Sequence, residues 1–271
     1  MNDTEILKNL RKEIFLVGFS GGMAHFASCY SCLEILYVLY CKNILQERDH
    51  FILSKGHAGL ALYAVLCSKG ILSKDEFHSY LKPGSHIGGE PCMRDMPFVE
   101  ASTGSLGHGL SMGVGMAMAQ KLDKTPARTF VILGDGELEE GSVWEAAMSA
   151  AAFKLDNLVA ILDANEIQKM DSIANTIGMN NWHEKWDAFG WQVFEVDGHD
   201  VSALMKILER KNEVGKPQLI IAHTVKGKGV SIMENNPAWH FKLPNKKECA
   251  TFRTELGIAD EEWEAICNAR I

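Results

Sequence analysis

The sequence predicts an α/β protein whose open parallel sheet carries helices on both faces. Two observations predict this fold class. Short runs rich in branched and aromatic residues, most of them bounded by Gly, Asp or Asn, have the composition of buried parallel strands. Helical stretches separate the later runs, and such β-α-β alternation builds a parallel sheet. The expected strands are 50–53, 128–133, 157–162, 191–196 and 217–222.

Helices are expected where apolar residues recur with helical spacing. Ser73, with Glu76 three residues later, forms the capping box of a short helix. The other expected helices cover about 3–17, 31–41, 58–70, 142–154 and 200–212, with two short helices between 245 and 271. Residues 104–115 are Gly-rich but run straight into a helical pattern. No linker is therefore expected to divide the chain, and residues 1–271 are expected to form a single domain.

Composition and charge argue against several classes of partner. The 271 residues are 46% hydrophobic and 23% charged, which is sufficient for a folded core. The net charge is −8 and Lys and Arg are scattered, which argues against nucleic acid or an anionic membrane. No apolar stretch reaches the roughly 18 residues of a membrane span, and the polar N-terminus does not resemble a signal peptide. A cytoplasmic protein is expected.

The seven cysteines are expected to be reduced thiols, most of them buried. Cys29 and Cys32 have a CxxC spacing, but no second CxxC or His pair completes a zinc site. The odd number also argues against a full disulfide framework.

The strongest functional signal lies after two of the expected strands. Gly134-Asp135-Gly136 follows one strand and Asn165 follows the next. Parallel sheets bind ligands at the edge where the strands end. A hard divalent cation prefers oxygen ligands, which the Asp135 carboxylate, the Asn165 amide and the Ile167 carbonyl supply. Two diphosphate oxygens and a water would complete the octahedron that Mg²⁺ prefers, and the glycines let phosphates approach backbone N–H groups.

The segment GDGELEEGSVWEAAMSAAAFKLDNLVAILDANEIQ (134–168) resembles the thiamine-diphosphate motif of transketolases. The resemblance implies the thiamine-diphosphate-binding fold, in its diphosphate-binding domain, with thiamine diphosphate and Mg²⁺, or Ca²⁺ or Mn²⁺, as cofactors. Further similar segments are SKGHAGLALYAVL (54–66), VEASTGSLGHGLSMGVGMA (99–117), WDAFGWQVFEVDGHD (186–200) and AHTVKGKGVSIMENNPAWH (222–240).

The resemblance also implies which residues contact the cofactor. Gly104 is expected near the diphosphate and Leu106 near the aminopyrimidine, where a helix N-terminus suits an anion. His108 replaces a common glutamine and either contacts the ligand or caps the helix. Lys226 either approaches the diphosphate or is a solvated lysine. Glu140 resembles a family residue at an interface between subunits, and its alternative role is a charge in a first helical turn. The cofactor-binding set is completed by Gly134, Asp135, Gly136, Asn165 and His240.

Three histidines are the catalytic candidates. In transketolases a carbon of the cofactor attacks a ketose carbonyl and a two-carbon fragment passes to an aldose, so hydroxyls must be held and deprotonated. Histidine suits this work because its ordinary pKa lies near neutrality. His25 in GGMAHFAS, His57 in SKGHA and His240 in PAWHFKLP match family histidines. His25, which lies in a degenerate motif, and His57 are also expected to contact the substrate.

The segment GSHIGGEP (84–91) departs from the family pattern. Glu90 stands where the family carries a substrate-contacting histidine. A carboxylate there changes the electric field beside the hydroxyls of the donor sugar. Either His86 substitutes for that histidine from nearby, or the accepted sugar is not the usual pentose phosphate.

The resemblance implies a partner as well. The pyrimidine-binding domain and the C-terminal domain are expected on a separate chain, in an assembly of two copies of each chain (α2β2) that acts on small sugar substrates. Three alternatives are open: a transketolase specialised for sulfo-, branched or nucleotide-linked sugars, the α subunit of a 2-oxo acid dehydrogenase, and a non-catalytic relative. The SKGHA, WHFKLP and VDGHD segments favour transketolase over the dehydrogenase, and intact Asp135, Asn165, His57 and His240 argue against the non-catalytic relative.

Overall fold

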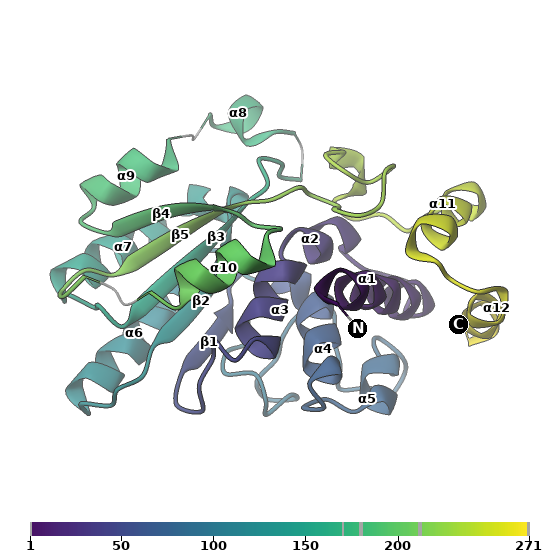
Figure 1. Ribbon diagram of the computed structural model, residues 1–271, viewed down its shortest axis with the longest axis horizontal. Coiled ribbons are helices and arrows are strands. Elements are labelled where there is room, and N and C mark those ends of the chain that lie inside the picture. Colours follow the sequence, from purple (N-terminus) through teal and green to yellow (C-terminus); the bar gives the residue numbers. More distant parts are fainter. Residues whose placement is uncertain (1, 170, 179–180, 211–212, 270–271) are drawn as a thin grey trace.

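A five-stranded parallel sheet lies at the centre of the computed structural model (Figure 1). The structure describes residues 2–169, 171–178, 181–210 and 213–269. The strand order is β1-β2-β3-β5-β4, and every neighbouring pair is parallel. The strands are β1 (His50–Leu53), β2 (Thr129–Gly134), β3 (Leu158–Ala164), β4 (Gln192–Asp197) and β5 (Gln218–His223). All five expected strands are therefore present.

Helices fill both sides of this sheet. The α-helices are α1 (Asp3–Ser20), α2 (Phe26–Ser31), α3 (Leu33–Cys41), α4 (Gly59–Ser68), α5 (Lys74–His78), α6 (His108–Leu122), α7 (Gly141–Ala152), α8 (Ile173–Thr176), α9 (Trp182–Ala188), α10 (Val201–Leu208), α11 (Lys246–Leu256) and α12 (Asp260–Ala269). Single 3-10 turns are η1 (Gly56–Ala58), η2 (Gly136–Glu139) and η3 (Pro237–Trp239). The capping box of Ser73 and Glu76 begins α5, as the sequence predicts.

Alternate residues of the central strands pack into two separate cores. Phe130 and Ile132 of β2 belong to the core formed with α1, α3, α4 and α10. Val131 and Leu133 point to the opposite face and pack with α6, α7 and α9, where Trp186 is fully buried. Because both faces are covered, the strands read as continuous apolar runs. The prediction of an open parallel sheet with helices on both faces is confirmed (Figure 1).

Three element predictions need correction. The helix expected over 31–41 begins at Leu33, because the backbone leaves the helical region at Cys32 (φ −98°, ψ 8°), and Ser31 is the last residue of a separate helix, α2. The strand expected over 191–196 is not fully buried, because β4 is an edge strand with a single neighbour. The helix expected over 200–212 ends at Leu208, and residues 211–212 lie outside the described residues.

The cysteines are free thiols, as expected, but most of them are not buried. Cys29, Cys32 and Cys249 are buried in the core, whereas the other four are partly or fully exposed. The apolar spacing around Cys29 and Cys32 identifies core positions, while isolated cysteines elsewhere carry no such signal.

The register of the sheet positions the functional turns. Leu133 of β2 pairs with Leu162 of β3, and Gly134 pairs with Asp163. The residues that follow these pairs therefore leave the sheet side by side at its carboxyl edge. In the part of the chain that the structure describes, no helix is both long and apolar enough to cross a membrane.

Candidate active site

A cavity of about 270 Å³ opens at the carboxyl edge of the sheet, where β2, β3 and β5 end. It brings together twelve of the residues singled out from the sequence with five that were not. The twelve are His25, His57, Glu90, Gly104, Leu106, Gly134, Asp135, Gly136, Asn165, Ile167, Lys226 and His240. The five are Ser28, Lys55, Glu137, Gln168 and Lys169. Segments distant in sequence thus converge on one site.

The predicted metal ligands lie together on two neighbouring turns. Asp135 is buried at the start of η2, where its carboxylate accepts hydrogen bonds from Gly136 N at 2.8 Å and Glu166 N at 2.5 Å. Asn165 follows β3, and its Oδ1 accepts a hydrogen bond from Ile167 N at 3.2 Å. Burial, together with the nearby Asp163 charge, raises the pKa of Asp135. A bound divalent cation would stabilise this buried carboxylate in its charged form.

This donor set suits a metal only when a further ligand contributes. Among the described residues, no three His, Cys, Asp or Glu side chains converge to hold a metal by themselves. The turn instead offers one carboxylate, one amide oxygen and one backbone carbonyl, which leaves positions for diphosphate oxygens and water. The cavity residues therefore fit a hard cation shared with a diphosphate.

Lys226 is a buried cation of the cavity and not a solvated lysine, with 2% of its surface exposed. Its Nζ donates a hydrogen bond to the Ile167 carbonyl at 2.5 Å and lies 3.3 Å from His240 Nδ1. Burial, with the neighbouring Lys55 charge, lowers the pKa of Lys226. An anionic ligand in the cavity would offset both buried charges.

The three candidate histidines form a cluster in the same cavity as the predicted metal ligands. The ring centroid of His25 lies 5.2 Å from that of His57 and 5.4 Å from that of His240, and the centroids of His57 and His240 are 5.8 Å apart. Burial lowers the pKa of His25 to about 4 and that of His240 to about 3, with further contributions from Lys226. Burial also holds the pKa of His57 well below its ordinary value. All three rings are therefore neutral near pH 7, so each offers one donor and one acceptor.

Two glycines shape the backbone around the cavity. Gly104 (φ 137°) and Gly107 (φ 87°) both lie in the left-handed region that side chains disfavour. A Cβ at Gly107 would lie 2.6 Å from Ser142 Oγ, and one at Gly104 would collide with the Glu90 carboxylate. The turn before α6 consequently accepts no larger residue at either glycine, and Gly104 presents its backbone to the cavity.

Glu90 lines this cavity and also a second, outer cavity of about 390 Å³. Met23, Tyr80 and Phe241 form much of the outer wall, and His25, Lys169 and His240 belong to both cavities. Glu90 is therefore shared by the two cavities.

The structure does not bring three of the predicted site residues into either cavity. His86 is exposed, with its Nε2 3.6 Å from Glu76 Oε1, so it does not take the place of a histidine at Glu90. His108 is the first residue of α6 and is exposed. Glu140 is the exposed N-cap residue of α7, and its side chain packs beside Gly107.

Sequence reasoning missed three buried charges around the cavity. Lys55 forms an ion pair with Asp163, and both are almost fully buried. Glu137 accepts hydrogen bonds from Gly107 N at 2.9 Å, Gly134 N at 3.1 Å and the Ser54 hydroxyl. Its carboxylate thereby ties three separate loops together. Asp163 was detectable, since a carboxylate inside the apolar run LVAILDA must find a buried partner.

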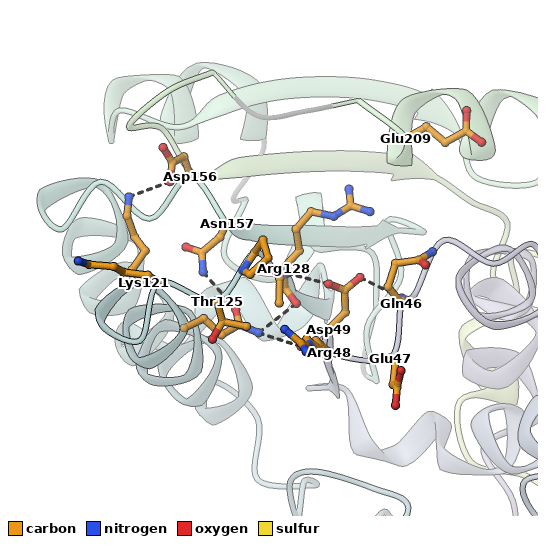
Figure 2. A pocket seen from close by; sticks show the side chains of 14 residues that line it. Gln46, Glu47, Arg48, Asp49, Lys121, Thr125, Arg128, Asp156, Asn157 and Glu209 are labelled. Atoms are coloured by element: carbon orange, nitrogen blue, oxygen red, sulfur yellow. Dashed lines mark hydrogen bonds and ion pairs between the residues drawn. The ribbon is translucent and has the colours of Figure 1, made fainter.

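A larger cavity of about 850 Å³ lies at the opposite end of the sheet (Figure 2). Asp49, Arg128 and Asn157, which line it, come directly before β1, β2 and β3, so this cavity faces the amino ends of the strands. Its charges are mixed, and Lys121 pairs with Asp156 at 2.7 Å (Figure 2). None of the predicted site residues reaches this cavity.

The geometry agrees with what comparison with known proteins shows. Residues 25–268 match the family described as transketolase, thiamine diphosphate binding domain. The chain belongs to the transketolase family. It is 39% identical over 269 residues to one subunit of the apulose-4-phosphate transketolase of Phocaeicola vulgatus, covering 96% of this chain and 95% of that protein. It is 38% identical to the 6-deoxy-6-sulfo-D-fructose transketolase subunit SqwG of a Clostridium species, covering 90% and 87%.

Solved transketolases share the fold over the whole of this chain. The transketolase of Campylobacter jejuni superimposes with a TM-score of 0.83 and 27% identity, over 98% of this chain. The match covers 46% of that protein, so this chain spans about half the length of the solved transketolase. The fold of the transketolase family's thiamine-diphosphate-binding domain therefore accounts for the parallel sheet of this chain.

Proposed function

We propose that this chain is the thiamine-diphosphate- and metal-binding subunit of a two-chain transketolase. Such an enzyme transfers a two-carbon ketol unit from a ketose, or its phosphate, to an aldose. The observation that carries the proposal is the single cavity in which oxygen donors on two strand ends meet three neutral imidazoles. Relatives of nearly the same length, each named as one subunit of a transketolase, support it.

Asp135, Asn165 and the Ile167 carbonyl would hold Mg²⁺, or Ca²⁺ or Mn²⁺, together with diphosphate oxygens. Lys226 supplies a buried positive charge beside them. Gly104 and Leu106 line the same cavity, which supports the expected contacts with the diphosphate and the aminopyrimidine.

When bound, thiamine diphosphate supplies the nucleophilic carbon that carries the two-carbon unit. The residues of this chain bind and orient the sugar around that carbon. A neutral imidazole accepts a hydroxyl proton at one ring nitrogen and donates a hydrogen bond from the other. His25, His57 and His240 can therefore hold adjacent hydroxyls and move their protons without charging the site beforehand.

A separate chain with the pyrimidine-binding domain is the proposed partner. The names of the relatives support it, because each describes a single subunit and so implies a second one in that relative. We assign an α2β2 assembly with a place in carbohydrate metabolism in the cytoplasm. Small sugars are the substrates, and the net charge of −8 supports the absence of nucleic acid or membrane partners.

A transketolase specialised for a modified sugar is a second candidate. Glu90 favours it, because this carboxylate lines both cavities. Two relatives are named for apulose 4-phosphate and 6-deoxy-6-sulfo-D-fructose, which are not the usual pentose phosphates.

Glu90→His is expected to change the choice of donor. The substitution replaces a negatively charged hydrogen-bond acceptor with an imidazole. Donor sugars that place an anionic group near Glu90 should therefore bind the variant more tightly, and donor sugars that place a hydroxyl against Glu90 should bind it less tightly. We expect the ratio of kcat/KM for xylulose 5-phosphate over a modified ketose to change about tenfold, since one hydrogen bond to a charged group contributes about 1.5 kcal/mol or more. An unchanged ratio would remove Glu90 from donor selection.

The function is tested by a two-carbon transfer assay on this chain together with a pyrimidine-domain chain, Mg²⁺ and thiamine diphosphate. A panel of ketose phosphates and modified ketoses serves as donors. Turnover is expected only in the mixture, and the preferred donor separates the two candidates. A mixture that binds the cofactor but transfers no two-carbon unit from any donor would favour the non-catalytic relative.

A further inference from the structure

Asp163 is a buried carboxylate that the proposed chemistry does not use directly. It lies in β3 with no exposed surface, beside Gly134 of the metal turn. Lys55 Nζ forms an ion pair with its Oδ2, which also accepts a hydrogen bond from Ser31 Oγ at 2.6 Å. The Thr224 hydroxyl donates to its Oδ1. These partners come from separate segments of the chain, and they stabilise a charge that would otherwise be costly to bury.

Asp163 also faces the amide of a metal ligand. Asn165 Nδ2 lies 3.4 Å from Asp163 Oδ2 and 3.4 Å from the Asp163 backbone carbonyl. An amide nitrogen is only a donor and an amide oxygen is only an acceptor, so two acceptors on one side fix the orientation of the group. The Asn165 oxygen consequently points to the other side, toward Ile167 N and the metal turn.

Lys55 is the second group that Asp163 controls. Its Nζ lies in the cavity wall, close to Asp163, with the Ser28 carbonyl at 3.3 Å and Ser31 Oγ at 3.5 Å. Asp135 is the other buried aspartate whose charge acts on Lys55. Asp135 lines the same cavity as Lys55 and follows Gly134, where an added Cβ would lie 3.8 Å from the Lys55 side chain. If Asp163 lost its charge, Asp135 would be the remaining aspartate of this cavity for the buried ammonium group.

We infer that Asp163 is a positioning residue that keeps the metal ligands available. It retains Lys55 by an ion pair, so that Lys55 does not occupy Asp135, and it orients the Asn165 amide with its oxygen toward the cation. This inference rests on the proposed function, because it concerns the same metal turn. Groups behind metal ligands commonly change metal affinity by about 10- to 100-fold when they are altered.

The test uses the complex of this chain with a pyrimidine-domain chain. Tryptophan fluorescence follows thiamine diphosphate binding during a Mg²⁺ titration at saturating thiamine diphosphate. Asp163→Asn is expected to raise the Mg²⁺ concentration at half-saturation by about 10-fold or more, because Lys55 then competes for Asp135. The double substitution Asp163→Asn with Lys55→Met removes the competitor and is expected to return half-saturation to within about threefold of the native complex.

Ser31→Ala is the matched control, since it removes one hydrogen bond to Asp163 while the charge and its ion pair remain. Its half-saturation should stay within about twofold of native. A native value in Asp163→Asn, or an equal loss in the single and double substitutions, would overturn the inference. If Asp163→Asn does not fold, the double substitution decides alone, because it buries no unpaired charge. An increase of more than about tenfold in its Mg²⁺ half-saturation would count against Lys55 as the competitor. A native complex that binds no thiamine diphosphate at any Mg²⁺ concentration would instead refute the proposed function.

Discussion

Asp135→Asn is expected to weaken Mg²⁺-dependent binding of thiamine diphosphate strongly while leaving the fold intact. Asp135 supplies the carboxylate of the donor set, and the other two ligands are a neutral amide and a carbonyl. Loss of that charge should weaken Mg²⁺-dependent binding by about 100-fold or more. At about 1.4 kcal/mol for each tenfold change, this corresponds to a loss of about 2.8 kcal/mol of binding free energy. Isothermal titration of thiamine diphosphate into the two-chain complex, with and without Mg²⁺, measures the loss.

Stability separates this effect from unfolding. Burial raises the pKa of Asp135, which means that the charged form is unfavourable in the folded chain without metal. An amide removes this buried charge but keeps only one of the two backbone hydrogen bonds that the carboxylate accepts. The two effects oppose each other, so the thermal midpoint of the metal-free chain should change little. Asp187→Asn, an exposed carboxylate on α9, is the control and should bind the cofactor normally. Retained Mg²⁺ dependence in Asp135→Asn would place the metal elsewhere.

The proximity of the two turns that carry the proposed metal ligands was predictable, because its signals are local and the sheet rule is general. Apolar runs followed by Gly134-Asp135-Gly136 and by Asn165 identify two strand ends. Parallel pairing then requires both ends to lie at one edge, and the register of Leu133 with Leu162 is the result. Nothing beyond the two sequence segments was needed to bring these ligands together.

Long-range charge pairing was not predictable in the same way. Lys55 and Asp163 are more than 100 positions apart in the chain, and no spacing rule connects them. Only the fold shows that Lys55, which precedes η1, finds its charge partner in β3. Glu137 is a similar case, because the sequence presents it as one of several acidic residues before α7, while the fold buries it against Gly107.

The conformation of the 84–91 loop also distinguishes His86 from Glu90 as a residue of the cavity, which the sequence did not do. His86 and Glu90 lie four positions apart, and either was able to occupy the substrate position. The backbone turns so that Glu90 meets Gly104, whereas His86 faces Glu76 on the surface. Such a choice depends on tertiary contacts of an irregular segment, for which periodicity gives no information.

His57→Asn is expected to lower kcat by about 100- to 1,000-fold, the range in which a positioned acid–base group contributes. Asparagine keeps a donor and an acceptor of similar reach but cannot take up a proton at ordinary pH. Binding of thiamine diphosphate and Mg²⁺ should be nearly unchanged, because His57 lies with the histidine cluster and not among the three proposed metal ligands. Steady-state assays of the complex, combined with cofactor titration, distinguish the two effects.

The pH profile provides the second readout for the histidine cluster. Burial lowers the pKa of His25 to about 4 and that of His240 to about 3. Lowering the pH from about 8 to about 6 therefore protonates neither ring. Because both pKa values are lowered, activity that depends on neutral imidazoles should persist through this range and fail only in more acidic buffer. His78→Asn, an exposed histidine 3.4 Å from Glu13 on α1, is the control and should retain native kcat. A native kcat in His57→Asn would remove it from proton transfer. The profile is measured at saturating Mg²⁺ and thiamine diphosphate, because without metal the raised pKa of Asp135 lies near the same pH range. Under that condition, a loss of activity near pH 6.5 in the native complex would show that at least one ring titrates at its ordinary pKa.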